Sequence, residues 1–129
     1  MSITLEEDDL GLVVEAMSDA ERHALPFGAV RLDRDYVVKF YSEREARGSG
    51  MGHRNQLGRQ FFADIAPCFA NDNYLGRIER DRAEGDIDIE MGWIGDFADE
   101  NSELRVRIVS APDGGLWIFT MRGSDRAAA

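Results

Sequence analysis

Residues 28–41 read GAVRLDRDYVVKFY, and this stretch predicts a β-hairpin. Its two ends are rich in β-branched, aliphatic and aromatic residues, the types that favour extended strands. Between them, Asp33-Arg34-Asp35 carries the short polar side chains typical of a tight turn. The hairpin therefore supplies the first two strands of the domain.

Three further strands are predicted in the last third of the chain, where apolar residues recur with a period of two. The alternating apolar positions are Ile87, Ile89, Met91 and Trp93, then Leu104, Val106 and Ile108, then Leu116 and Ile118, with Trp117 and Phe119 on the opposite face. Turn-forming residues at 99–101 and 111–115 separate these segments. This pattern predicts three strands in hairpin succession.

Helical segments are predicted between these two groups of strands. Residues 42–60 are glycine-rich and favour short helical turns, and residues 61–65 favour one amphipathic turn that ends before Pro67. A longer helix with Ile78 on its apolar face is expected to end at Gly85. An antiparallel sheet with helices on one face is an α+β architecture.

The first 25 residues are expected to form a helical cap. Apolar residues between Leu5 and Met17 have roughly helical spacing, although Gly11 predicts a short and loosely held helix. Ser18 and Glu21 form a capping-box pattern that begins a second helical turn. We therefore predict a cap over residues 1–25, a core over 26–122 and a flexible tail over 123–129.

Composition limits the possible partners and locations. The chain has 129 residues, which fits one domain, and a net charge of −10, which would repel a nucleic-acid backbone. No apolar stretch approaches the ~20 residues that cross a bilayer, and no basic secretory signal is visible. We expect a cytoplasmic monomer or weak dimer with no nucleic-acid or membrane partner.

Enzymatic and metal-dependent functions find little support among the reactive residues. Cys68 is the single cysteine, which excludes an internal disulfide and leaves one thiol for covalent chemistry. His23 and His53 lack further metal ligands at useful spacing, so no metal site is expected. No order of residues typical of a catalytic triad is apparent, and we expect the chain not to be an enzyme.

Four segments together resemble a known family. They are residues 25–33 (LPFGAVRLD), Phe40-Tyr41 with Glu45 four positions after Tyr41, residues 58–62 (GRQFF) and residues 64–68 (DIAPC), and their mutual spacing has no gap from Phe27 to Cys68. With the order of strands and helices, this pattern resembles a PAS domain and, within that fold, the photoactive yellow protein family. The resemblance covers roughly residues 22–122.

The resemblance implies a chromophore site. In the family, a cysteine carries p-coumaric acid (4-hydroxycinnamic acid) as a thioester, and Cys68 matches that cysteine. Tyr41 and Glu45 match the two residues that donate hydrogen bonds to the chromophore's phenolate. The supporting pocket positions fall on Ser49, Met51, Phe61 and Trp93. The chain departs from the family at Met51, which stands in place of an arginine, and at Gly95, which stands in place of an aromatic residue.

The implied function is that of a blue-light photoreceptor that signals to a downstream partner. Trans-to-cis isomerisation would be followed by proton transfer from Glu45, leaving a buried carboxylate without a partner and releasing the N-terminal cap. Residue types alone also allow plainer roles. Cys68 could be a small buried hydrophobe, Glu45 could complete a capping box with Ser42, and Tyr41 could be an ordinary strand aromatic.

A rival function keeps the PAS fold but not the chromophore. Such a sensor would bind a small ligand or use Cys68 as a redox-sensitive thiol.

Overall fold

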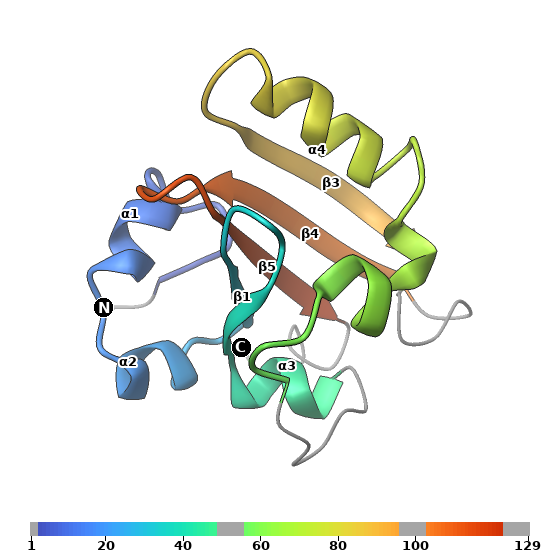
Figure 1. Cartoon of the computed structure of the whole chain (residues 1–129). Helices are drawn as coiled ribbons and strands as arrows, with labels where there is room; N and C mark the ends of the chain where they lie inside the picture. Colours follow the sequence, from blue (N-terminus) through green and yellow to red (C-terminus); the bar gives the residue numbers. More distant parts are fainter. Residues whose placement is uncertain (1–2, 49–55, 96–102, 123–129) are drawn as a thin grey trace.

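The computed structural model describes residues 3–48, 56–95 and 103–122, and Figure 1 shows one twisted sheet with helices on both sides. The sheet has five strands in the order β2-β1-β5-β4-β3, and all neighbouring strands are antiparallel. The strands are β1 (Gly28–Leu32), β2 (Val38–Tyr41), β3 (Asp88–Gly95), β4 (Glu103–Ser110) and β5 (Leu116–Arg122). The predicted α+β class with a five-stranded antiparallel sheet is confirmed.

The helices fall into two groups that cover opposite faces of this sheet (Figure 1). The first group comprises α3 (Glu43–Gly48), the π-helical turn η1 (Phe61–Ile65), the 3-10 turn η2 (Pro67–Phe69) and α4 (Leu75–Arg82). The second comprises α1 (Leu10–Glu15) and α2 (Asp19–His23). We call the face under the first group the site face and the face under the second group the cap face.

The site face holds the larger apolar core. Ile78 of α4 and Phe61 of η1 pack there against alternate residues of all five strands, as the period-two pattern predicts. The buried strand residues on this face are Val30, Leu32, Val38, Ile89, Met91, Leu104, Val106, Ile108, Leu116 and Ile118. A register shift between Met91 and Ile94 pairs Ile94 with Leu104, which interrupts the alternation predicted to continue to Trp93.

The cap face is sealed by the N-terminal segment. Leu5, Leu10 and Val14 are fully buried against a cluster that includes Trp117 and Phe119 of β5. The first helix is shorter than the pattern predicts, since it covers only Leu10–Glu15. The second begins at the predicted capping box, in which the Glu21 amide donates to Ser18 Oγ and the Glu21 carboxylate accepts from the Ser18 amide.

Gly11 has a different role from the one that its helix propensity suggests. A Cβ atom at this position would lie 2.7 Å from Cγ2 of Val109 on β4, so only glycine lets α1 approach the sheet this closely. The glycine that lowers the helix propensity here therefore also allows close packing of α1 on β4.

The predicted hairpin turn at residues 111–115 is confirmed. The Ala111 amide donates to the Gly115 carbonyl over 2.9 Å, and Gly114 has a φ of 89° that favours glycine. In the first hairpin, Asp33 Oδ1 accepts hydrogen bonds from the amides of Asp35 and Val37. Across the described ranges, no helix is both long enough and apolar enough to span a bilayer.

Candidate functional site

Ser42 directly precedes helix α3, and its hydroxyl group connects the helix to the sheet. Ser42 Oγ accepts a hydrogen bond from the Glu45 amide over 3.2 Å and another from the Ala29 amide over 3.0 Å. The Ser42 amide in turn donates to the Ala29 carbonyl over 2.9 Å. These bonds fix the start of α3 directly beside β1.

The carboxylate of Glu45 points from α3 onto the site face of the sheet and is fully buried. Its two oxygens accept from the two terminal nitrogens of Arg122, over 2.8 Å to Oε1 and 3.1 Å to Oε2. Thr120 Oγ1 also donates to Oε1. The capping-box alternative is therefore wrong for this side chain, because the carboxylate faces β5 and not the backbone at Ser42.

Gly28 on β1 makes room for this arrangement. A Cβ atom at Gly28 would lie within 3.0 Å of both Glu45 Oε1 and Thr120 Oγ1, a separation that real Cβ atoms essentially never show. Gly28 pairs with Thr120 across the β1–β5 ladder, so the two residues bracket the same point on the sheet. Because Gly28 has no side chain, the Glu45 carboxylate can lie between it and Thr120.

Arg122 and Thr120 were not among the residues predicted for the site. The expectation that an ionised Glu45 would be buried without a partner is wrong, because an arginine 77 residues away in sequence contacts both carboxylate oxygens. A signal was present in the sequence. Continuing the alternation of Leu116 and Ile118 places Thr120 and Arg122 on the same face, as polar residues on a buried strand.

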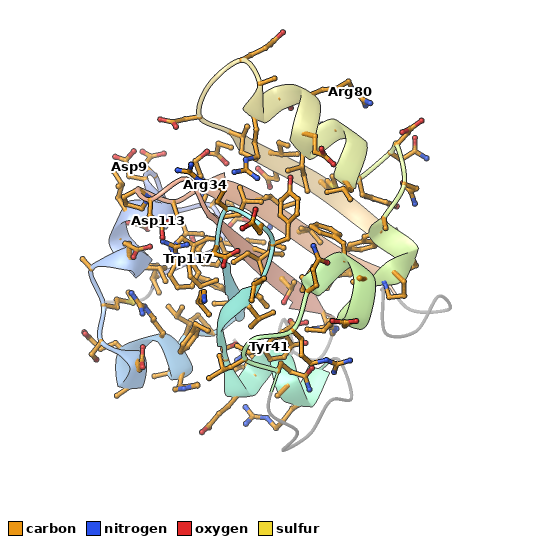
Figure 2. The ribbon with its side chains drawn as sticks, in the orientation of Figure 1. Asp9, Arg34, Tyr41, Arg80, Asp113 and Trp117 are labelled. Atoms are coloured by element: carbon orange, nitrogen blue, oxygen red, sulfur yellow. The ribbon has the colours of Figure 1, made fainter. Side chains whose placement is uncertain are left out.

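Tyr41 is the last residue of β2 and lies beside α3 (Figure 2). It pairs with Val30 across the β1–β2 ladder and is half-buried against the core of the site face. Its backbone position therefore places it on the same face of the sheet as Glu45.

Cys68 lies in η2 and is exposed. Pro67 starts this turn, and the Cys68 carbonyl accepts a hydrogen bond from Asn71 Nδ2 over 2.8 Å. The next residue, Phe69, is buried and stacks on Tyr74 with ring centroids 4.5 Å apart. Cys68 is therefore not a small buried hydrophobe, because it is exposed and the buried apolar side chain beside it is that of Phe69.

Of the four other residues predicted for the pocket, two lie in the part of the chain that the structure describes. Phe61 is buried on the site face and meets Phe62 edge to face at 5.1 Å between centroids. Trp93 lies in β3, and Gly95 is the last residue of that strand. Ser49 and Met51 lie outside the described residues, as do the predicted turn at 99–101 and the predicted tail.

Two hydrogen bonds connect the cap to the residues immediately before Glu45. His23 Nδ1, at the end of α2, accepts from the Glu43 amide over 3.1 Å. Arg44 Nε donates to the Leu25 carbonyl over 3.0 Å. A displacement of α3 would therefore act directly on the end of the cap.

A second connection to the cap comes from β4, next to the edge strand β3. Arg107 Nη1 donates to the carbonyls of Leu5 and Glu7, while its Nε and Nη2 donate to the carboxylate of Asp88. The hydrogen bonds from Arg107 lower the pKa of Asp88 below its ordinary value, and they outweigh the opposing effect of burial. The first residues of the cap are therefore held by a charged group of β4.

Known proteins resemble this chain over most of its length. The photoactive yellow protein of Rhodothalassium salexigens is 30% identical over 121 residues, which cover 93% of this chain and 97% of that protein. The chain belongs to the photoactive yellow protein family. The photoactive yellow protein of Halochromatium salexigens is 29% identical over 116 residues, or 89% of this chain and 93% of the relative. No family model matches the sequence.

A solved structure of the same family shares the fold. The photoactive yellow protein domain of the sensor histidine kinase Ppr from Rhodospirillum centenum superposes with a TM-score of 0.72 at 28% identity, covering 85% of this chain and 97% of that domain. The predicted family and the PAS fold are thus confirmed. Membership of the photoactive yellow protein family makes the chain a photosensory PAS domain.

Proposed function

We propose that this chain is a blue-light receptor, not an enzyme, and that it carries a p-coumaroyl group as a thioester on Cys68. One observation carries the proposal. The single thiol of the chain is exposed on η2, a turn that packs by Phe69 onto the same face of the sheet as the buried Glu45. An activated acyl donor can therefore reach the sulfur from solvent, while polar groups lie deeper on that face.

The attachment step balances with one thiol and one activated acid. Sγ of Cys68, as the thiolate, attacks the carbonyl carbon of the activated p-coumaric acid, and its proton passes to solvent. The sulfur–carbon bond forms as the bond to the activating group breaks, and that group leaves with the electron pair. No oxidant or reductant is required.

The polar groups on the site face suit a buried phenol or phenolate. An anion taken out of water needs donors to replace its hydration. Tyr41 has a hydroxyl group to donate, and Thr120 and Arg122 add a hydroxyl group and a guanidinium beside Glu45. Glu45 can donate only when its carboxyl is protonated. Tyr41 and Glu45 would thus hold the oxygen end, and Cys68 the acyl end.

The output would pass through α3 to the cap. When bound, the p-coumaroyl group would supply blue-light absorption and a phenolate oxygen that can accept a proton. Glu45 would transfer its carboxyl proton to that oxygen, and its side chain would then exchange one set of partners for another. Because Glu43 and Arg44 bond to His23 and Leu25, this exchange would loosen the end of the cap. A downstream signalling protein would read the released cap.

A second candidate function rests on the exposure of Cys68 itself. An accessible thiol is also what a redox-sensitive sensor needs. Such a sensor would bind no chromophore, and its response would be oxidation of the sulfur.

Reconstitution decides between these functions. The unpigmented chain is mixed with an activated ester or anhydride of p-coumaric acid, and its mass and visible spectrum are recorded. We expect the mass of one coumaroyl group and a blue-light absorption band in the wild type, and neither in Cys68→Ala. A folded wild type that gains neither would overturn the receptor proposal. Reversible sulfur oxidation by peroxide in that same sample would favour the redox sensor.

A further inference from the structure

The ion pair between Glu45 and Arg122 places a permanent positive charge under α3. Glu45 is fully buried, and the Arg122 side chain is only 8% exposed. The contact has two points, which is the strongest geometry for a guanidinium and a carboxylate. Thr120 supplies a third donor to the same carboxylate. Thr120 and Arg122 lie two residues apart on one strand, β5.

The charge on Arg122 stays fixed under all ordinary conditions, because a guanidinium in a protein does not lose its proton. A buried cation is strongly unfavourable without an anion beside it, and a second anion in the same place would be equally unfavourable. Arg122 therefore favours one negative charge at the position that the Glu45 carboxylate occupies. Without pigment, that charge is the carboxylate of Glu45.

We propose that Arg122 is the fixed counter-ion of the site and positions Glu45, in that it limits Glu45 and a bound phenolate to one negative charge between them. The part that concerns a bound phenolate rests on the proposed function, and the part that concerns the unpigmented chain does not. In the unpigmented chain, Glu45 is ionised on Arg122. With a phenolate bound, Glu45 takes one proton from solvent and becomes a donor.

Arg122 also determines which partners the Glu45 carboxylate has after it loses its proton. The carboxylate then regains Arg122 and Thr120 as partners, the contacts that it makes in the chain without pigment. The net charge around Arg122 is the same before and after the transfer. The direct contact of Arg122 with the ionised Glu45 stabilises the light state, and the re-formed contact pulls α3 toward β5. We expect slow dark recovery as a result.

The first test needs no pigment. The chain is labelled with carbon-13 at glutamate carboxyl groups, and the Glu45 resonance is assigned by its loss in Glu45→Gln. We expect an ionised Glu45 at neutral pH in the wild type and a protonated Glu45 in Arg122→Gln. Arg105→Gln is the matched control, because Arg105 also bonds two carboxylates, Glu6 and Glu90, but those are exposed. It should leave Glu45 ionised.

Two results of this measurement would overturn the inference. One is a protonated Glu45 in the unpigmented wild type at neutral pH, which needs no variant and so does not depend on whether Arg122→Gln folds. The other is a folded Arg122→Gln in which Glu45 stays ionised. Arg122→Lys keeps the charge, so it should keep Glu45 ionised even though it loses the two-point contact.

The second test uses pigmented protein. Because Arg122 stabilises the state with an ionised Glu45, dark recovery after a flash should be more than about tenfold faster in Arg122→Gln than in the wild type or Arg105→Gln. Equal recovery rates in all three would contradict the counter-ion role. If Cys68 accepts no pigment, the proposed function fails, while the carboxyl measurement still decides the role of Arg122.

Discussion

His23 Nδ1 accepts a hydrogen bond from the backbone amide of Glu43 over 3.1 Å, and this bond joins the last residue of α2 to the first residue of α3. Glu43 lies two residues before Glu45, so the cap and the buried carboxylate are connected through less than one turn of helix. The His23 ring also packs on Phe40 of β2, with centroids 4.8 Å apart. His23 thus touches both elements that support the site.

We expect His23→Phe to separate these two contacts. Phenylalanine keeps the ring against Phe40 but cannot accept the bond from the Glu43 amide. In the dark, amide hydrogen exchange in α2 should rise several-fold, which corresponds to a loss of about 1 kcal/mol, the usual value of such a bond. In pigmented protein, the difference between light and dark exchange over residues 3–25 should shrink. Exchange over residues 3–25 that matches wild type in both states would mean that the cap is not coupled through His23.

Gly28→Ala should destabilise the fold although it adds only one methyl group. That methyl would meet both Glu45 and Thr120, so α3 or β5 must shift. We expect a loss of about 1–3 kcal/mol in the free energy of unfolding, measured with urea.

Gly76→Ala in α4 is the matched control for this substitution. Its Cβ atom would lie 3.1 Å from the flexible ends of Arg80 and Asp72 and in ordinary contact with Asp72 Cβ at 3.5 Å. Alanine there should be neutral or stabilising by up to about 1 kcal/mol, because alanine favours the helix. Equal stabilities of the two variants would show that Glu45 does not need the space at Gly28.

The strands could be predicted because their signal is local. Alternate side chains of β4 face the core of the site face, so the period of Leu104, Val106 and Ile108 predicts both the strand and the face that packs on this core. The shared spacing around Tyr41, Glu45 and Cys68 likewise predicted the family, since it lies within one stretch of chain. Local pattern was sufficient for both conclusions.

The ion pair of Glu45 could not be predicted in this way, because it depends on strand order. Arg122 reaches Glu45 only because β5 lies next to β1, although β2, β3 and β4 come between them in sequence. Gly11 shows the same limit, since its propensity indicates a weak helix while its contact with Val109 requires a glycine. Both depend on which elements pack together, and composition carries little information on that.

Acid should weaken the contact between the cap and β4. The pKa of Asp88 is lowered by the hydrogen bonds from Arg107, so the folded chain favours the ionised form more than the unfolded chain does. The stabilisation is fully present above the unfolded pKa of about 3.9 and is lost as the pH falls through the lower, folded pKa. Glu6 and Asp113, whose pKa values are also lowered, by Arg105 and by the Gly115 amide respectively, contribute in the same direction.

Asp88→Asn isolates the share of Asp88 in this pH dependence. The side chain of Asp88 is 55% exposed, so solvent screening limits its contribution to roughly 0.5 kcal/mol. Between pH 7 and pH 3, the wild type should lose about that much more stability than Asp88→Asn, as measured by urea unfolding at each pH. An identical pH dependence in the two proteins would exclude the Asp88–Arg107 pair as a source of acid sensitivity.

Glu45→Gln should affect stability and colour in ways that depend on the pigment. Without pigment, glutamine leaves the buried charge of Arg122 with no anion from Glu45, and we expect a loss of about 3 kcal/mol or more in the free energy of unfolding. Glu90→Gln, which disrupts the exposed pair with Arg105, should cost less than about 1 kcal/mol.

With pigment, a bound phenolate supplies the missing anion, so attachment should restore much of the stability of Glu45→Gln and add less to that of the wild type. The pigmented variant should absorb at longer wavelength, because an amide donates a weaker hydrogen bond than a carboxylic acid to the phenolate. Urea unfolding of both proteins before and after attachment measures the first effect, and a visible spectrum measures the second. If pigment stabilises the two proteins equally, Arg122 does not act on the phenolate, and an unchanged spectrum would remove Glu45 from the chromophore's hydrogen bonds.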